Sequence, residues 1–165
     1  MNIFGSFANS MQVYKFMLTF TRTNSEHPDF VALVGLLDAD LAIKNGEQNS
    51  FFAQYNKIAL IQHVILAYEN GVAIACGAIK EYEPGTMEVK RMFTQPDTRG
   101  KGVASQVLTQ LEAWTKELGY TKCILETGKH MPDAVHLYQK NGYTVIPNYG
   151  QYAGVEKSIC FEKLL

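Results

Sequence analysis

The strongest constraint on the fold of this 165-residue chain is a change of hydrophobic period near Pro96. Before it, the turn pairs Asn70-Gly71 and Pro84-Gly85 separate apolar runs, and Asn-Gly favours the positive φ angles of a tight hairpin. After it, apolar residues recur every three or four positions over 103–118, which is the spacing of a helix with one buried face. Three strands are therefore predicted before the helix, at 64–68, 72–79 and 87–94.

The rest of the chain alternates between strand and helix patterns. Residues 11–21 predict a strand, and Asp29 is expected to cap a helix that ends at Asn45-Gly46. The segment 48–62 fits either a short helix or a loop. Further elements are predicted at 122–127 (strand), 132–140 (helix) and 158–162 (strand). This order predicts an α/β (α+β) sandwich around a largely antiparallel sheet, and the meander excludes a simple Rossmann repeat.

The composition favours one globular domain over residues 1–165. Hydrophobic residues make up 47% of the chain and charged residues 19%, and no Pro/Gly/Ser-rich linker divides it. A domain of this length buries roughly 70% of its unfolded surface, so it needs no disulfide or metal to fold. Lys+Arg 15 against Asp+Glu 16 gives a net charge of −1, which excludes wholesale binding to nucleic acid or anionic membranes.

The cysteines and histidines show no spacing typical of a disulfide framework or a metal site. Cys76, Cys123 and Cys160 lie far apart in apolar stretches, which predicts reduced, buried thiols. The four histidines lack metal-ligand spacing, so no metal is expected. The first ten residues do not read as a signal peptide, and no apolar run approaches the roughly 20 residues of a membrane span. We expect a cytoplasmic protein.

Residues 91–104 pass from a predicted strand through a glycine-bearing turn into the predicted helix, with the spacing R-x-x-G-x-A. The first backbone N–H groups of a helix lack intrahelical partners and lie at the positive end of its dipole, so they favour an anion. Gly100 and Gly102 would let a phosphate approach these amides, and Arg99 and Lys101 add charged donors. The segment predicts a phosphate site, and the alternative is an ordinary glycine-bearing helix start.

Two other nucleotide-binding motifs do not fit this turn. A P-loop requires G-x-x-x-x-G-K-[ST], but Lys101 is followed by Gly102. A dinucleotide fingerprint requires G-x-G-x-x-G, but Ser105 stands at the third glycine position.

A second motif follows the predicted helix and strand: residues 136–143 read HLYQKNGY and are similar to L-Y-x-K-x-G-[FY]. Together with the R-x-x-G-x-A turn, it makes the chain from about Val64 onward resemble the GCN5-related N-acetyltransferase (GNAT) superfamily. The resemblance implies a GNAT-like fold, with a mostly antiparallel sheet and helices on both faces. Four further segments resemble those of a bacterial GNAT subgroup whose substrates are largely unassigned: 37–41 (LDADL), 88–92 (EVKRM), 125–128 (LETG) and 158–163 (SICFEK).

The resemblance implies acetyl-CoA as co-substrate. The diphosphate would bind the turn 99–104, and the pantetheine arm would pair with the strand at 92–94, where a backbone N–H would donate to the thioester oxygen. Thr127 or Gly128 would replace an asparagine that the family often carries. The implied cofactor-binding residues are Met92, Phe93, Thr94, Arg99, Gly100, Lys101, Gly102, Val103, Ala104 and Thr127.

Two groups are candidates for moving protons. Tyr138 belongs to the second motif and is the candidate general acid that protonates the departing thiolate. Glu88 is the candidate base for the ammonium, with Glu126 or a water relay as alternatives. Either carboxylate could instead form a structural ion pair with Lys90 or Arg91.

The aromatic, glycine-rich segment 147–154 is predicted to be a loop beside the acceptor. Tyr149 and Tyr152 are expected to line the acceptor pocket, and Arg91 is a candidate for holding a substrate carboxylate. The alternatives are an exposed hairpin or a contact in a homodimer.

The expected function is acetyl transfer to a primary amine of a small molecule or amino acid. Two other functions stay open: an acyl-CoA-sensing module without turnover, and a protein lysine or N-terminal acetyltransferase.

Overall fold

A computed structural model describes residues 17–55 and 60–165 of the chain. In chain order the elements are β1 (Leu18–Thr23), α1 (Pro28–Asn45), η1 (Gly46–Gln48), α2 (Asn49–Ala53), β2 (His63–Glu69), β3 (Val72–Glu83), β4 (Thr86–Thr94), η2 (Pro96–Thr98), α3 (Val103–Glu117), β5 (Lys122–Gly128), α4 (Pro132–Lys140), β6 (Thr144–Ile146), η3 (Gly150–Tyr152) and β7 (Ser158–Leu164), where η marks a 3₁₀ turn. The predicted first strand, 11–21, lies partly outside the described residues, and within them the strand runs to Thr23.

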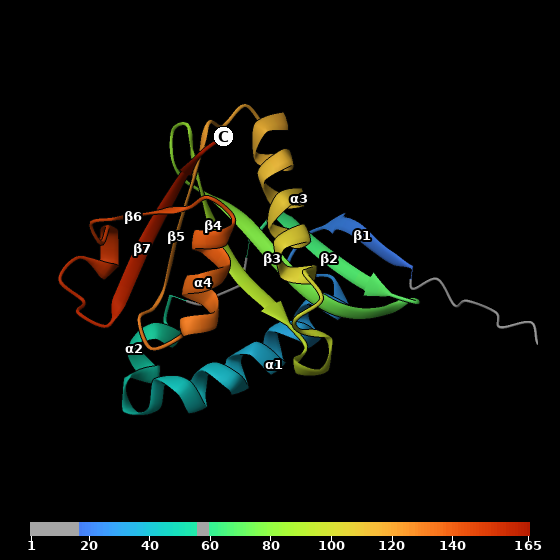
Figure 1. The fold of residues 1–165 in the computed structure, drawn as a ribbon, viewed down its shortest axis with the longest axis horizontal. Helices are drawn as coiled ribbons and strands as arrows, with labels where there is room; N and C mark the ends of the chain where they lie inside the picture. The colour runs from blue at the N-terminus through green and yellow to red at the C-terminus, as the bar shows by residue number, and fades with distance from the viewer. Residues whose placement is uncertain (1–16, 56–59) are drawn as a thin grey trace, which may run out of the picture.

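The strands form one seven-stranded sheet in the order β1-β2-β3-β4-β5-β7-β6 (Figure 1). Every pair of neighbours is antiparallel except β4 and β5, which are parallel. The predicted α/β class and mostly antiparallel sheet are confirmed, as are the two hairpin turns and the helix pattern over 103–118. β6 was not predicted, because two of its three residues are exposed and its sequence carries no buried alternation.

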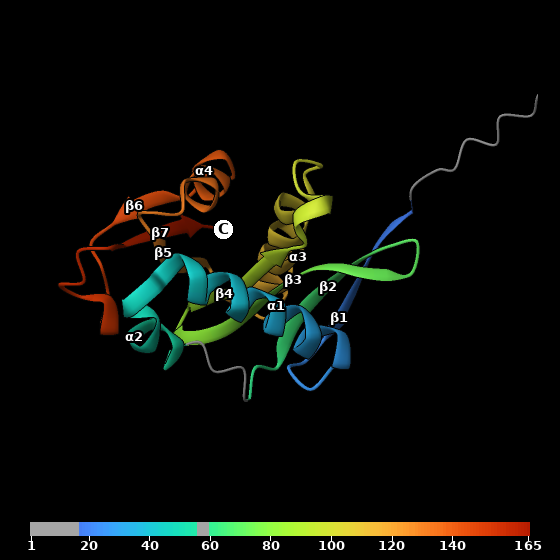
Figure 2. The same cartoon turned by 90° about the horizontal axis from the view of Figure 1, so that it is seen from below.

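Helices cover both faces of the sheet (Figure 2). One apolar core lies between the sheet and the pair α3 and α4, and it includes Met87 and Val89 of β4. A second core lies against α1 and includes Phe93 of the same strand. Because side chains alternate along a strand, Glu88 and Lys90 project from the α1 face, opposite Met87 and Val89. This alternation decides which polar residues reach which side of the sheet.

The start of α1 differs from the expectation that Asp29 caps it. His27 is the N-cap residue, and its Nδ1 accepts a hydrogen bond of 3.2 Å from the backbone N–H of Asp29. Pro28 occupies the first helical position, where its missing N–H costs nothing. The Asp29 carboxylate instead accepts a hydrogen bond from Tyr68 of β2 at 2.7 Å, and so ties the helix to the sheet.

The sheet divides between β4 and β5. Among the described residues, these strands pair only over Thr86–Glu88 and Lys122–Ile124. Beyond that point β4 continues beside β3 and β5 continues beside β7, so the two strands diverge, with α4 next to the opening (Figure 1). The main chain of β4 that faces β5 is therefore left without a ladder partner along its second half.

A β-bulge in β4 accompanies this divergence. Cys76 pairs with Phe93 and Ala78 with Lys90, so the single residue Gly77 lies opposite two residues, Arg91 and Met92. Arg91 adopts a positive φ of 57°, which is uncommon outside glycine. A Cβ at Gly77 would overlap the sulfur of Met92 and lie 2.9 Å from Leu111 Cδ1 of α3. Glycine at 77 thus lets the bulged strand pack on α3.

We predict that Gly77→Ala destabilises the protein by about 1–3 kcal/mol, the usual cost of overpacking a core. Urea unfolding measures this as a lower midpoint at unchanged slope. The matched control is Gly35→Ala in α1, where a Cβ meets nothing within 4 Å and helix propensity favours alanine. Equal midpoints for Gly77→Ala and wild type would contradict the close packing at the bulge.

Candidate active site

A cavity of about 680 Å³ lies at the divergence of β4 and β5 and is lined from both faces of the sheet. Its walls come from α1, α2, β4, α3, β5, α4 and Tyr152. The lining includes most of the residues predicted from the sequence: Glu88, Arg91, Met92, Phe93, Thr94, Arg99, Gly100, Gly102, Val103, Ala104, Glu126, Thr127, Gly128, Tyr138 and Tyr152. Lys101 and Tyr149 do not line it.

The start of α3 presents free backbone donors to this cavity. Gly102 is the N-cap with φ 76°, no side chain caps it, and Gln106 makes the first hydrogen bond back to its carbonyl at 3.2 Å. The N–H groups of Val103, Ala104 and Ser105 therefore have no intrahelical acceptor, and all three residues line the cavity. A Cβ at Gly102 would meet nothing within 4 Å, so the positive φ, not lack of space, is what favours glycine there.

The two cations of the turn are placed differently. Arg99 Nε donates to the carbonyl of Thr94 at 2.9 Å, and its guanidinium lies 5.8 Å from the centre of the Phe93 ring at the edge of the cavity. Lys101 forms an ion pair of 3.6 Å with Glu69 of β2. Of these two, Arg99 is the one positioned to meet an anion in the cavity.

Tyr138 reaches the cavity from α4. Its side chain is buried, and its ring packs against those of Tyr143 and Phe161 at centroid distances of 5.9 and 6.0 Å. Burial raises the pKa of the Tyr138 hydroxyl above its ordinary value, and the negative charge of Glu126 raises this pKa further. The hydroxyl is therefore protonated at neutral pH.

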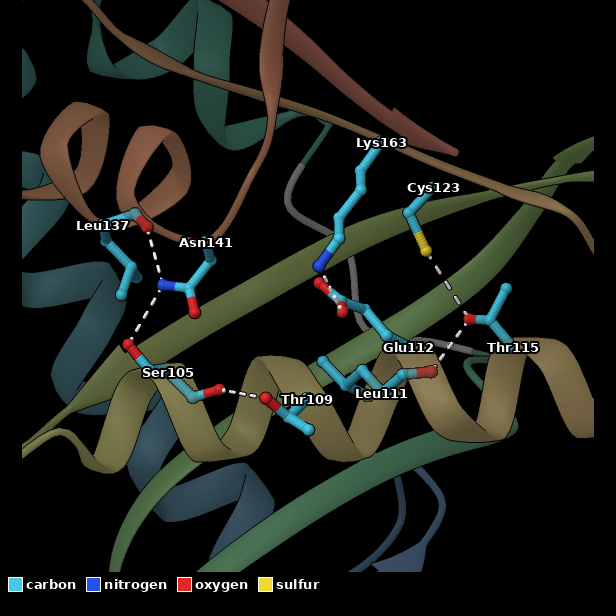
Figure 3. Close-up of polar contacts among 9 residues, drawn as sticks. All are labelled: Ser105, Thr109, Leu111, Glu112, Thr115, Cys123, Leu137, Asn141 and Lys163. Carbon is cyan, nitrogen blue, oxygen red and sulfur yellow. Dashed lines mark hydrogen bonds and ion pairs between the residues drawn. The ribbon is translucent and has the colours of Figure 1, made fainter. Parts of the chain in front are cut away.

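Polar contacts join α4 and the sheet to α3 (Figure 3). Asn141, just after α4, donates to the carbonyl of Leu137 at 2.7 Å and to Ser105 Oγ in the first turn of α3 at 3.0 Å. Near the other end of α3, Glu112 forms an ion pair of 2.7 Å with Lys163 of β7. These contacts fix the free amides of α3 relative to Tyr138 and to the sheet.

Two carboxylates enter the site from the opposite face. Glu88 accepts hydrogen bonds from Lys90 Nζ at 3.1 Å and from the Tyr149 hydroxyl at 3.0 Å. Glu126 accepts a hydrogen bond from Ser158. Burial raises the pKa of Glu126, and the nearby charge of Glu88 adds to this effect, while Ser158 and Lys90 oppose it. The anticipated ion pair with Lys90 is thus formed by Glu88.

Arg91 lies between β4 and α1. Its side chain is 2% exposed and donates from Nη2 to Asp38 of α1. Its Nε is buried without a hydrogen-bond partner. The guanidinium therefore fastens α1 to the bulged part of β4, although the residue also contributes to the cavity wall.

The predicted loop 147–154 contains the turn η3 and folds against the sheet. The Tyr149 and Tyr152 rings lie 5.8 Å apart, and Tyr149 also contacts Tyr82 at 5.0 Å. Tyr152 is 4% exposed and contacts Tyr55 at 6.0 Å. Burial raises the pKa of both hydroxyls, with the charges of the nearby carboxylates contributing. The segment thus belongs to the connection between the antiparallel strands β6 and β7, with the Tyr149 and Tyr152 rings packed against neighbouring rings and Gly150, Ala153 and Gly154 exposed.

Several lining residues escaped sequence reasoning. Phe52 of α2, which is 9% exposed, lines the cavity together with Leu37 and Leu41 of α1. His130, in the loop between β5 and α4, is exposed and also lines the cavity. A Cβ at Gly128 would lie 2.5 Å from its ring, so glycine there allows the close approach. In the sequence, only Leu37 and Leu41 belong to a motif, the LDADL segment. Phe52 and His130 are brought to the cavity by the tertiary structure.

The described residues contain no metal site and no membrane span. Over 17–55 and 60–165, no group of three or more His, Cys, Asp or Glu is placed to hold a metal ion. In the same ranges no helix combines the length and apolarity needed to cross a bilayer. Cys76, Cys123 and Cys160 are free and buried, as predicted.

The comparisons identify the class of protein that this fold and cavity define. Residues 32–143 match the model of the acetyltransferase (GNAT) family, and the chain belongs to that family. It is an acetyltransferase of the GNAT type.

Individual relatives agree with this assignment. The chain is 34% identical to an IAA acetyltransferase of Azospirillum brasilense over 102 residues, which is 61% of this chain and 67% of that protein. A candidate acyl-CoA N-acyltransferase from Klebsiella pneumoniae superimposes with a TM-score of 0.76 and 28% identity, covering 90% of this chain and 98% of the other. The PaiA N-acetyltransferase of Thermoplasma acidophilum, solved with coenzyme A, shares the fold at a TM-score of 0.68 and 17% identity, covering 90% and 99%.

Proposed function

We propose that this chain is an acetyl-CoA-dependent N-acetyltransferase that acetylates the primary amine of a small molecule or amino acid. The observation that carries the proposal is the cavity between β4 and β5, which joins the free amides of α3 to Tyr138 and to the carboxylates Glu88 and Glu126. An acetyl donor held by its phosphates at one end would present its thioester to an amine at the other. The cytoplasm, with its reducing conditions, suits the three buried free thiols.

The donor would lie along the open side of β4. Its diphosphate would accept hydrogen bonds from the N–H groups of residues 103–105 and from Arg99. The pantetheine arm would pair with the main chain of 92–94, opposite Thr127 and Gly128 of β5. A backbone N–H near Met92 and Phe93 would donate to the thioester oxygen, which gains negative charge as the amine attacks.

Tyr138 would protonate the departing thiolate. The acyl C–S bond breaks as the amide C–N bond is completed, and the sulfur takes the phenolic proton. Before the reaction Tyr138 is neutral, because burial raises the pKa of its hydroxyl. The tyrosine is then reprotonated from solvent.

Glu126 would remove the proton from the attacking ammonium. Lys90 and Tyr149 each donate a hydrogen bond to one oxygen of Glu88, so both of its oxygens are engaged, whereas Ser158 donates to one oxygen of Glu126. Glu126 is more basic than an ordinary glutamate because burial raises its pKa, and a base is most effective when its pKa lies closer to neutral pH. Glu88, the first candidate from the sequence, would instead hold the positive charge of the amine nearby.

The direct test measures release of coenzyme A from acetyl-CoA in the presence of amines, amino acids and peptides. Release that depends on an amine supports the proposal. Binding of acetyl-CoA without release on any acceptor would indicate a sensing module instead, and release on peptides alone would indicate a protein acetyltransferase.

Acetyl-CoA at 100 times its Kd should stabilise the wild-type protein by about 2.7 kcal/mol, seen as a rise in Tm. Gly102→Asp should abolish this rise, because it places a negative charge beside the phosphates. Gly102→Asn is the matched control: asparagine tolerates the same left-handed backbone without the charge, so most of the rise should remain. Equal shifts in the two variants would contradict this location for the diphosphate.

Tyr138→Phe should lower kcat by about 10²–10⁴-fold and change the KM for acetyl-CoA little, since the hydroxyl acts only as the thiolate leaves. Phenylalanine keeps the ring packing, and the acetyl-CoA thermal shift serves as the control for folding and binding. An unchanged kcat under conditions where chemistry limits turnover would reduce Tyr138 to a packing residue.

The pH profile of kcat/KM should distinguish the two carboxylates. A base must be deprotonated, so activity should rise with pH through its pKa, and for Glu126 this limb should lie above the ordinary glutamate value of about 4.3. Glu126→Gln should remove the limb, and Glu88→Gln should keep it. The reverse result would assign the base to Glu88, and a limb kept in both variants would indicate a water relay.

A further inference from the structure

The acceptor end of the cavity lies on the α1 face of the divided sheet. Glu88 is level with Ile124 in the last β4–β5 pair, so Lys90 and Glu126, each two residues further on, follow on the same face where the strands part. Phe52 of α2 and Tyr152 line this side as well. If the chain has the proposed function, the nitrogen of the acceptor lies beside the charged side chains of Glu88, Lys90 and Glu126.

The charges there do not balance. Lys90 is the cation between Glu88 and Glu126: it pairs with Glu88 at 3.1 Å and also acts electrostatically on Glu126. Two carboxylates and one ammonium leave a net charge of −1 when all three are ionised, because 1 − 2 = −1. That remaining charge favours an acceptor which arrives as a cation and disfavours an additional carboxylate.

The neighbouring cations of the cavity wall on this face are already paired. Arg91, which the sequence suggested for a substrate carboxylate, is 2% exposed, and its charge is balanced by Asp38 through Nη2, although its buried Nε has no hydrogen-bond partner. Lys44, near the end of α1, forms an ion pair of 2.6 Å with Asp40. The other cationic lining residues belong to the turn before α3 or to α4, on the side of the cofactor phosphates: Arg99 and Lys140.

The wall around these charges is apolar and aromatic. Tyr152 and Phe52 are only 4% and 9% exposed, and Leu37 and Leu41 of α1 continue the surface. Tyr152 is supported by the rings of Tyr149 and Tyr55. A site of this kind buries a hydrocarbon or aromatic body, and aromatic faces also attract an ammonium group.

We infer that the acceptor is a small primary amine on an apolar or aromatic body, with no carboxylate next to the amino group. This inference rests on the proposed function and narrows it: of the two acceptor classes, amines and amino acids, it selects the first. The ammonium lies between Glu88 and Glu126, and the body packs against Tyr152 and Phe52.

Three matched acceptors test the inference: 2-phenylethylamine, phenylalanine amide and phenylalanine. 2-Phenylethylamine and phenylalanine both carry strongly basic amines and differ in the carboxylate, so their comparison tests the charge, and the amide tests whether a neutral group of the same bulk is accepted. We expect kcat/KM for phenylalanine to be at least about tenfold below that for 2-phenylethylamine, because a carboxylate meets like charges at short range. Phenylalanine as good as or better than 2-phenylethylamine would overturn the inference.

The aromatic wall is tested with Tyr152→Ala and its control, Tyr152→Phe. The alanine variant should raise the KM for 2-phenylethylamine at least about fivefold over wild type, and the phenylalanine variant, which keeps the ring, should raise it less, with the acetyl-CoA thermal shift as the control for folding in both. An unchanged KM in Tyr152→Ala would remove Tyr152 from the acceptor site and contradict the inference.

The outcomes separate this inference from the proposed function. Two results overturn the inference and still leave an acetyltransferase. One is faster turnover of phenylalanine than of 2-phenylethylamine. The other is faster turnover of a peptide with a blocked N-terminus and a free lysine side chain than of all three small acceptors. Failure of every acceptor to release coenzyme A, with acetyl-CoA still bound, overturns both.

Discussion

The site depends on the early end of the ladder between β4 and β5. A fully paired sheet would separate the residues of its two faces with continuous main chain. Here the two strands part after Glu88 and Ile124, and the bulge opposite Gly77 turns β4 further away. The unpaired stretch creates the cavity and lets groups on both faces reach the same space. On the proposed function, this arrangement lets the amine on one face reach the thioester carbonyl carbon of a donor held from the other face.

The two faces differ in their electrostatics. On one face, free amides at the start of α3 and the Arg99 guanidinium favour the phosphates of a donor, and the contact between Asn141 and Ser105 keeps Tyr138 in register with them. On the other face, carboxylates outnumber the available cation and favour an ammonium. On the proposed function, each end of the cavity would select its substrate by charge, and the sheet would hold the two ends apart. Burial then adjusts proton affinity: it keeps Tyr138 neutral and makes Glu126 more basic.

Much of the fold was predictable from the sequence because its signals are local. Asn70-Gly71 and Pro84-Gly85 fix the meander, and the helices α3 and α4 begin and end close to the predicted residues. Where the prediction was wrong or silent, another local interaction competed or the signal was weak. His27 takes the capping position because Pro28 begins the helix, which leaves Asp29 for Tyr68. β6 is an exposed edge strand of three residues and has too few buried positions for a pattern.

The sequence by itself determined most of the elements, the glycine-bearing turn before α3 and the tyrosine motif, since each depends on backbone conformation or helix spacing within a few residues. Only the tertiary structure decided which distant side chains meet. Tyr149 reaches Glu88 across 61 positions, and Arg91 reaches Asp38 across 53. No local pattern encodes such pairs, because they follow from strand order, from the bulge and from the face on which each side chain emerges. The choice between candidate bases and the charge of the acceptor end depend on these pairs.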